Sequence, residues 1–430
     1  MTGRFVIKGF GKGTAILVAA LLLSPYLMSA QTVRKELPDL EFARFGLDKI
    51  VFLGDSAAFE KAFAKMDGAL LTGSGNFRIL HIGGSHVQGG TLTRQFRNNL
   101  LALGDGIDGG RGMVFPYTAA KTNTPSCYRS RYEGEWEATK NTTRDLPRRL
   151  GLTGMAVTTS DPAASVKIVL KARNATPADP DFRFDRLNVL GYASDGELFP
   201  VVVTNSGDTL AGVRNEAASC WSYMLPTPQD SVKVAVAGSG GDLTLTGIYL
   251  DNDSPGISVT GIGVNGAAVP SYLRCEDFER DLMMVKPDLV ILAIGINDAS
   301  GNNFSQDEFI ARYKTLVKRI RLANPDCALL FVTNNDSFRR VRRRVYSVNR
   351  NGLEAQEAFF RLCQDCGGGY WDLFGIMGGL GSMKKWEEAG LARRDKIHFT
   401  DEGYAIIGDL LYNAFMEKYL EHLRRKSWLD

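Results

Sequence analysis

Residues 78–90 read RILHIGGSHVQGG, and they predict the strand–turn–helix unit around which the fold is built. The apolar run RILHIGG predicts a buried strand, and the apolar residues after it, spaced three or four apart, predict a helix. Those helix residues are Leu92, Phe96, Leu100 and Leu103. Ser85 lies in the turn between the two elements. A second serine, Ser56, lies in FLGDSAAFE at residues 52–60, so the sequence offers two candidate nucleophiles.

The second half of the chain alternates predicted strands and helices. From about residue 257, the helical pattern CEDFERDLMMVK is followed by the apolar runs LVILAIG and CALLFVTNN. Ser305 and Glu308 predict a capping box at the start of a further helix. The last helix begins near residue 402. Alternating strands and helices predict a three-layer α/β fold with a parallel, doubly wound sheet, as in flavodoxin-like proteins.

The region between residues 121 and 255 has a different pattern. Short β-branched or alternating runs such as MAVTTS, SVKIVLKA and SVKVAVAG are separated by Gly, Asp, Asn and Pro, with no helical pattern between them. This pattern predicts an all-β sandwich inserted into one α/β domain. The predicted organisation is a signal peptide at 1–30, the α/β domain at 31–120 and 256–430, and the sandwich at 121–255.

The first thirty residues have the pattern of a secretory signal peptide. Three basic residues precede the apolar run TAILVAALLLSPYLM, which leads to SAQ. Cleavage after Ala30 fits the small residues there, whereas Met28 fits an uncleaved anchor, and both interpretations remain open. No cysteine follows the run, which argues against a lipoprotein anchor, and no later stretch is long and apolar enough to span a membrane. We therefore expect an exported protein, periplasmic or secreted.

Charge and cysteine content narrow the possible partners. Without the three basic residues of the signal segment, the chain carries 48 basic and 48 acidic residues, so its composition gives no argument for nucleic acid binding. One basic run remains, RRVRRR at 339–344, which fits a solvated loop or helix face or a contact with an anionic polymer. The six cysteines are compatible with disulfides in an exported chain, and Cys363 and Cys366 fit either a local disulfide or two free thiols.

A catalytic serine needs a base, and only four histidines are available. His422 lies in a charged C-terminal helix, His81 lies inside a strand, and His86 is too close in sequence to Ser85 to approach its hydroxyl. His398 lies in RRDKIHFTDEGY, a polar loop before a helix, with Asp395 three residues earlier. On a loop, that spacing lets the carboxylate reach the Nδ1 side of the ring.

Donors for an oxyanion are expected at two further loops. ILAIGINDAS places Gly295 and Asn297 at the carboxyl end of a buried strand, where open α/β sheets place their sites. GIGVNGAAVP places Gly266 in a glycine-rich turn, where an unhindered backbone N–H can donate. Ser85 can offer its own N–H at the start of its helix.

Together and in this order, these motifs resemble the blocks of the SGNH (GDSL-type) hydrolases. The matching positions are Ser85 in block I, Gly266 in block II, Gly295-Ile-Asn297-Asp298 in block III, and Asp395 and His398 in the DxxH of block V. The resemblance implies Ser85 as nucleophile, His398 as base, Asp395 as the acid that orients it, and an oxyanion hole from Ser85, Gly266 and Asn297. Gly84 stands where block I has Asp. Ser56 has the better Gly-Asp-Ser triplet but precedes an ordinary amphipathic helix, so it is interpreted as a helix cap.

A narrower resemblance concerns the substrate. GGSHVQ, GRGMVFPY, LTLTGIYLDND, GVNGA, IMGGLGSMKKWEEAGL and DKIHFTDEGY together resemble exported bacterial SGNH enzymes related to peptidoglycan O-acetylesterases. Those enzymes carry a sandwich similar to a carbohydrate-binding module between blocks I and II. The resemblance implies an acetylesterase acting on an acetylated polysaccharide, most simply peptidoglycan, with no metal or organic cofactor. O-acetyl transfer, deacetylation of another polysaccharide, and a catalytically impaired glycan-binding protein remain alternatives.

Overall fold

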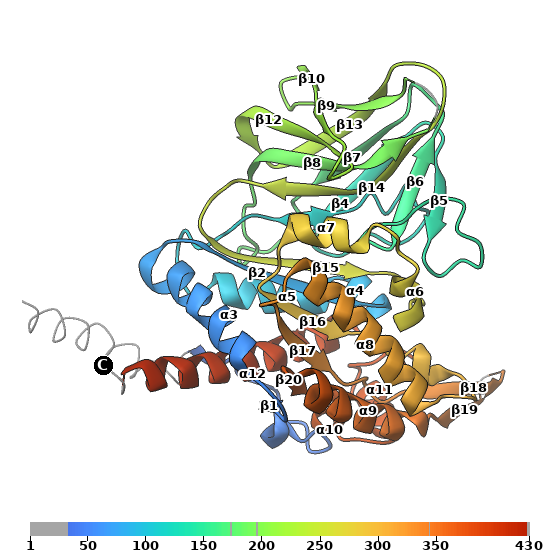
Figure 1. Cartoon of the computed structure of the whole chain (residues 1–430). Helices are drawn as coiled ribbons and strands as arrows, with labels where there is room; N and C mark the ends of the chain where they lie inside the picture. Colours follow the sequence, from blue (N-terminus) through green and yellow to red (C-terminus); the bar gives the residue numbers. More distant parts are fainter. Residues whose placement is uncertain (1–32, 173, 195–196, 344, 428–430) are drawn as a thin grey trace, which may run out of the picture.

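The computed structural model describes residues 33–172, 174–194, 197–343 and 345–427, so the expected signal segment lies outside the described residues. A six-stranded sheet forms the centre of the α/β part (Figure 1). Its order is β1 (Ile50–Phe52), β20 (Gly369–Trp371), β17 (Ala328–Val332), β16 (Leu289–Ala293), β2 (Asn76–Gly83) and β15 (Gly256–Gly263). Every neighbouring pair is parallel except β1 and β20, which are antiparallel, so the predicted parallel sheet has one antiparallel edge strand.

Helices cover both faces of this sheet and make three layers. The first face packs Phe77 and Ile79 of β2 against α3 (Ala57–Asp67), α5 (Thr91–Leu101) and α12 (Asp401–Ser427). The second packs Leu80 and Ile82 against a core that includes α7 (Phe278–Val285), α8 (Gln306–Ala323) and α9 (Asn351–Cys366). The alternation follows from the two-residue period of a strand, because a strand buried on both faces must be apolar throughout. The remaining helical segments are η1 (Phe45–Leu47), η2 (Gly68–Thr72), α4 (Ser85–Gln88), α6 (Val269–Leu273), η3 (Asp298–Ser300), α10 (Leu373–Ile376) and α11 (Ser382–Glu388).

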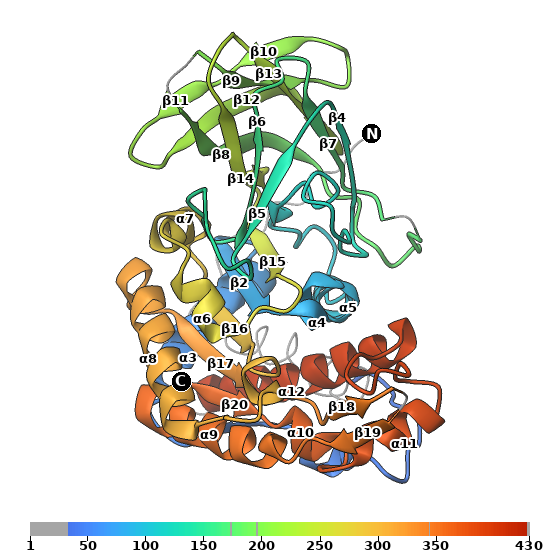
Figure 2. The ribbon, with the colours of Figure 1, turned by 90° about the vertical axis from the view of Figure 1, so that its right-hand side faces the viewer.

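Two antiparallel sheets form the inserted sandwich above the α/β part (Figures 1 and 2). One sheet has the order β10 (Thr209–Ala211), β9 (Phe199–Val203), β13 (Ser231–Ala237), β7 (Ser165–Val169) and β4 (Arg129–Glu133). The other has the order β11 (Val213–Asn215), β12 (Cys220–Gln229), β8 (Phe184–Ala193), β14 (Leu243–Asp251), β6 (Met155–Thr159) and β5 (Glu137–Lys140), with β3 (Gly112–Val114) also paired to β14. Because β3 precedes residue 121, strand pairing in the sandwich begins before the expected boundary.

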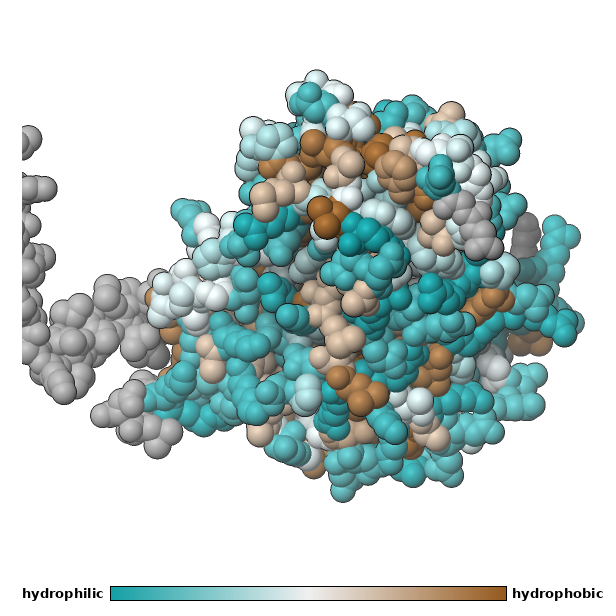
Figure 3. Space-filling model, turned by 45° about the horizontal axis from the view of Figure 1, so that its top comes forward, coloured by the Kyte–Doolittle hydropathy of each residue, from teal (hydrophilic) through white to brown (hydrophobic). Residues whose placement is uncertain are grey.

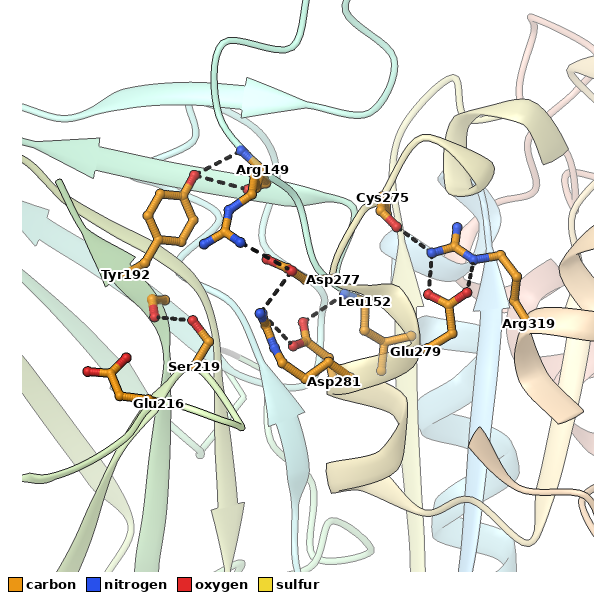
Figure 4. Close-up of polar contacts among 12 residues, drawn as sticks. Arg149, Leu152, Tyr192, Glu216, Ser219, Cys275, Asp277, Glu279, Asp281 and Arg319 are labelled. Atoms are coloured by element: carbon orange, nitrogen blue, oxygen red, sulfur yellow. Dashed lines mark hydrogen bonds and ion pairs between the residues drawn. The ribbon is translucent and has the colours of Figure 1, made fainter. Parts of the chain in front are cut away.

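Polar contacts hold the sandwich against α7. The buried carboxylate of Asp281 accepts the Leu152 N–H at 2.9 Å and lies 3.2 Å from Arg280 (Figure 4). Asp277 lies 2.8 Å from Arg280 and 3.8 Å from Arg149 of the sandwich side. On the other side, Arg94 of α5 makes an ion pair with Asp179. The sandwich is thus fixed to the α/β part at two helices.

Several local expectations need correction. Ser56 occupies the N-cap position of α3, but its side chain makes no capping bond, and Asp55 accepts the Ala57 N–H at 2.8 Å instead. Most of the RRVRRR run is strand rather than loop or helix: residues 339–342 lie on β18 (Phe338–Arg342), which forms a hairpin with β19 (Val345–Val348), and Arg343 lies in the turn. Of the capping box expected at Ser305 and Glu308, one bond is present, in which the Ser305 side chain accepts the Glu308 N–H.

The state of the cysteines, the helices and the surface were also compared with expectation. All six cysteines are free thiols, which is one of the two interpretations of the Cys363–Cys366 pair. In the described ranges, no helix combines the length and apolarity that crossing a membrane requires. The surface in Figure 3 is mostly hydrophilic, with apolar residues gathered over the sandwich.

Candidate active site

Three neighbouring strands bring the predicted site residues to one edge of the sheet. Gly83, the last residue of β2, is in register with Gly263 of β15 on one side and with Ala293 of β16 on the other. The chain leaves these three strands at the same level, and Ser85, the loop with Gly266, and Asn297 follow within a few residues. Carboxyl ends of parallel strands are where open α/β sheets form their sites.

A continuous hydrogen-bonded chain joins a serine, a histidine and an aspartate at this edge. Ser85 Oγ lies 2.7 Å from His398 Nε2, and His398 Nδ1 lies 2.9 Å from Asp395 Oδ2. The histidine comes from the loop before α12, more than three hundred residues after the serine. The structure therefore brings together all three residues predicted for nucleophile, base and orienting acid, in the arrangement that serine acyl transfer uses.

The loop around Asp395 keeps its carboxylate ionised. Burial alone would raise its pKa, but hydrogen bonds from the His398 ring and from the N–H groups of Ile397 and His398 hold the pKa of Asp395 well below its usual range. Lys396 adopts a φ of 58°, a left-handed conformation that lets the chain curl around the carboxylate. The aspartate can thus fix the tautomer of His398 with its proton on Nδ1, leaving Nε2 free to accept the Ser85 proton.

Three donors are available for an oxyanion beside Ser85. Within the described ranges, neither the N–H of Ser85 nor that of Gly266 has a hydrogen-bond acceptor. One hydrogen of the Asn297 amide is used on the carbonyl of Ala267 at 2.9 Å, and the other is free. A Cβ placed on Gly84 would lie 3.4 Å from both the Asn297 amide nitrogen and the Ala267 carbonyl oxygen, so these loops border the turn before Ser85.

Two supporting residues were not given roles from the sequence. Gln88, on the helix of Ser85 and 1 % exposed, accepts the N–H of Asn265 at 2.7 Å and donates to Asn123. Asp298 accepts the N–H of Val269 at the start of α6, and burial raises its pKa to about 6. Both fix the loop that carries Gly266. The signal for Gln88 was its position three residues after Ser85, on the same short helix.

The glycines next to Ser85 make the turn possible. A Cβ on Gly83 would lie 2.4 Å from Val87, and one on Gly263 would lie 2.4 Å from the Gln88 nitrogen, so neither position has room for a side chain. Gly84 has a negative φ and nearest neighbours at 3.4 Å. Its replacement of the usual block I acid therefore leaves the contact between Ser85 and His398 in place.

The other histidines have structural partners. His86 shares a hydrogen bond of 2.8 Å with the hydroxyl of Tyr404 and packs 5.1 Å from the His398 ring, and burial lowers its pKa to about 3. His81 is bonded to Thr93, and His422 lies between Glu60 and Asp67. Within the part of the chain that the structure describes, no group of three or more His, Cys, Asp or Glu side chains is arranged to hold a metal ion.

Comparison with known proteins agrees with this architecture. Residues 236–406 match the GDSL-like lipase/acylhydrolase family. Together with the fold and the serine–histidine–aspartate chain, that match defines the protein as a serine esterase of the SGNH class, with an inserted β-sandwich.

Individual solved structures were compared with the chain for their fold. A peptidoglycan O-acetylesterase superposes with a TM-score of 0.70 at 22% identity, over 86% of this chain and 99% of the other, and shares the fold of both parts. An acetyl xylan esterase matches 37% of this chain and 81% of its own at 22% identity, with a TM-score of 0.30. A GDSL-like lipase from Bacteroides thetaiotaomicron covers 37% and 76% at 17% identity, with a TM-score of 0.29. No curated protein matches the chain.

Proposed function

We propose that the protein removes O-acetyl groups from a cell-wall polysaccharide, peptidoglycan, through an acyl-serine intermediate. The observation that carries the proposal is the unbroken chain from Asp395 through His398 to Ser85, with distances of 2.9 and 2.7 Å. An ester is the substrate that this arrangement suits, because the hydroxyl, the base and the oxyanion donors meet at one edge of the sheet.

The reaction proceeds in two halves. His398 Nε2 takes the proton of Ser85 as its Oγ attacks the acetyl carbonyl, and the N–H groups of Ser85 and Gly266 with the Asn297 amide stabilise the oxyanion. The sugar oxygen leaves with the proton from His398, and the acetyl group remains on Ser85. Water then attacks with His398 again as base, which releases acetate and restores the serine.

A groove connected to the helix of Ser85 through Gln88 supports a polymeric substrate. It has a volume of about 810 Å³ and lies between α5 and the loops of residues 118–130 and 174–178. Thr122 and Asn123 border it and bond to Gln88 on the helix of Ser85. Its lining is rich in hydroxyl and amide groups, which suit the hydroxyl and acetamido groups of a glycan. We assign the sandwich the task of holding the polymer there.

Tyr128, Tyr132, Trp136 and Trp221 are aromatic residues of the sandwich region that could stack on sugars if their rings were exposed. Tyr128, Trp136 and Trp221 are 4–6 % exposed and belong to the core, whereas Tyr132 is 42 % exposed. Three of the four residues therefore contribute packing. Recognition of glycan by the sandwich then rests on the polar groove rather than on a row of exposed rings.

Exposed arginines near the catalytic loop favour an anionic polymer. The β18–β19 hairpin, called here the basic hairpin, presents Arg340, Arg342 and Arg343, and the catalytic loop presents Arg393 and Arg394. Within the described ranges, none of the five makes an ion pair. Unpaired exposed arginines attract carboxylates, and peptidoglycan carries them on its peptides.

The basic hairpin is attached directly to the catalytic loop. The N–H of Phe338 donates to the carbonyl of Lys396 at 3.0 Å, and the Lys396 ammonium lies 5.8 Å from the centre of the Phe338 ring. A polymer bound by the hairpin would therefore run past Asp395 and His398. We propose further that the protein is exported, as its N-terminal segment predicts, since this substrate lies outside the cytoplasm.

Acetate release tests the proposal. O-acetylated peptidoglycan, acetylated xylan and an aryl ester with a longer acyl chain are supplied separately, and initial rates are compared. We expect the highest kcat/KM on peptidoglycan. Equal or better rates on xylan would overturn the assignment of substrate, and a preference for the longer acyl chain would overturn the assignment of an acetylesterase.

A further inference from the structure

Two buried arginines meet one cysteine where α5 joins the sandwich. Arg97 on α5 is 2 % exposed and Arg111, just before β3, is 3 % exposed. Their guanidinium carbons lie 5.0 and 5.9 Å from the centre of the Phe182 ring, so the two charges share one aromatic neighbour. Arg111 Nη2 donates to the Cys127 sulfur at 3.0 Å. Cys127 is 8 % exposed.

No carboxylate pairs with these guanidinium groups. Across the described ranges, neither Arg97 nor Arg111 forms an ion pair, and Arg111 Nε, Arg111 Nη1 and Arg97 Nε are buried without a hydrogen-bond partner. Asp108 is a nearby carboxyl group, but burial raises its pKa, and its Oδ1 accepts the N–H of Gly110. A buried guanidinium without a counter-charge is costly, so the cluster favours an anion at the thiol.

The thiol of Cys127 differs from the other five. Burial acts to raise its pKa, but Arg111 and Arg97 together outweigh burial, and its pKa lies below the ordinary value. Burial raises the pKa of each of the other thiols, which lack such a pair of arginines; these are Cys220, Cys275, Cys327, Cys363 and Cys366. Other ionisable neighbours are Tyr117 and Tyr128, whose raised pKa values keep them neutral, and the Arg94–Asp179 ion pair. The wall of the adjacent cavity also carries Lys171, Asp181, Arg183 and Asp230.

The thiol can be reached from solvent through a pocket. Cys127 and Arg97 both line a cavity of about 420 Å³, bounded by the segment that contains Thr176 and Phe182. Reactive cysteines in proteins occupy electropositive, partly accessible surroundings, whereas inert ones are buried in apolar surroundings. Cys127 has both properties of the reactive class.

We propose that Arg97 and Arg111 hold Cys127 as a thiolate, and that this thiolate is the site at which the protein reacts with hydroperoxides. The sulfur attacks the terminal oxygen of the hydroperoxide, the O–O bond breaks, and an alkoxide or hydroxide leaves. The sulfur is oxidised to a sulfenic acid and the hydroperoxide is reduced. The site is separate from Ser85 and does not depend on the substrate assigned above.

Alkylation of the native protein tests the reactivity. A limiting amount of iodoacetamide is added near neutral pH, and peptide mass spectrometry measures the labelling of each cysteine. Cys127 should be alkylated ahead of Cys366, although Cys366 is the more exposed. Hydrogen peroxide followed by a sulfenic-acid probe should label Cys127 first. Labelling of Cys366 ahead of Cys127 by either route would overturn the modification site.

Ultraviolet absorbance tests for the thiolate without requiring that a reagent reach the sulfur. The native protein should show thiolate absorbance in the ultraviolet at neutral pH, and Cys127→Ser should remove it. Arg111→Gln should slow the alkylation of Cys127 by about tenfold, the effect of one pKa unit, while Arg111→Lys retains most of the rate. Esterase activity on a small ester checks that each variant is folded. Unchanged absorbance in Cys127→Ser would overturn the proposal, whatever the arginine variants do.

Discussion

Asp281 offers a test of the joint between the sandwich and the α/β part. Its side chain is fully buried, and burial raises its pKa from 3.8 to about 6 despite the nearby Arg280. The folded protein therefore retains a proton there at pH values at which the unfolded chain has released it. The contribution of Asp281 to the free energy of unfolding is fully present below about pH 4 and is lost as the pH rises through about 6. A difference of about two pKa units corresponds to about 3 kcal/mol.

The variant Asp281→Asn removes the titration but keeps an oxygen that can accept the Leu152 N–H. Urea unfolding should show that, relative to the wild type, this variant gains about 2–3 kcal/mol between about pH 4 and pH 7. Asp48 and Asp298 also titrate in this range, so only the difference between variant and wild type is informative. Asp281→Ala is the control, since it removes the same titration and should show the same change with pH. It also leaves the Leu152 N–H unpaired, so it should be less stable than Asp281→Asn by about 1–3 kcal/mol at both pH values.

Two results would refute this reasoning. A difference between Asp281→Asn and wild type that does not change with pH would show that Asp281 titrates normally. A relative loss of stability in the variant as the pH rises would show that the ion pair with Arg280 outweighs the cost of burial. Either result would mean that the joint tolerates a charged carboxylate.

Two further pairs of variants test the active-site turn and the binding of the polymer. Gly83→Ala should lower kcat, and overpacking should reduce its free energy of unfolding by about 1–3 kcal/mol. Gly84→Ala should retain most of the activity. An equal loss of activity in both variants would contradict the packing described at the turn. Changing the three arginines of the basic hairpin to glutamine should raise KM for peptidoglycan at low salt and leave the turnover of a small aryl acetate unchanged. The matched control, in which Lys49, Lys286 and Lys318 are changed to glutamine, should leave both activities unchanged. A loss of aryl acetate turnover in the hairpin variant would show instead that the hairpin supports the catalytic loop.

The strand–turn–helix unit at Ser85 and the alternation after residue 257 were sufficient to predict the α/β fold. Both rest on periodicity, which a sequence displays directly. The site residues followed from the few histidines and from motifs that resemble the blocks of the SGNH hydrolases. The register of the strands could not be predicted from the sequence. In the structure Gly83 lies opposite Gly263 and Ala293, and this register brings the site residues together.

Side-chain detail was less predictable. Ser56 has the right position and residue type for a cap, yet Asp55 makes the bond, because adjacent polar residues compete for the same N–H groups. The basic run gave no sign of its hairpin, since arginines occupy both faces of the strand and leave no alternation of polar and apolar residues. The pairing of Arg97 and Arg111 with Cys127 joins distant segments, which no local pattern shows.

A comparison of two serine variants measures most directly which residue is the nucleophile. Ser85→Ala and Ser56→Ala are assayed for kcat/KM on an aryl acetate, with circular dichroism to confirm that both are folded. Loss of a covalent nucleophile should lower turnover in Ser85→Ala by about 10⁴-fold or more, whereas Ser56, whose side chain makes no capping bond, should be replaceable with little effect. A folded Ser85→Ala protein that keeps wild-type activity, or a Ser56→Ala protein that loses it, would contradict the assignment of the site.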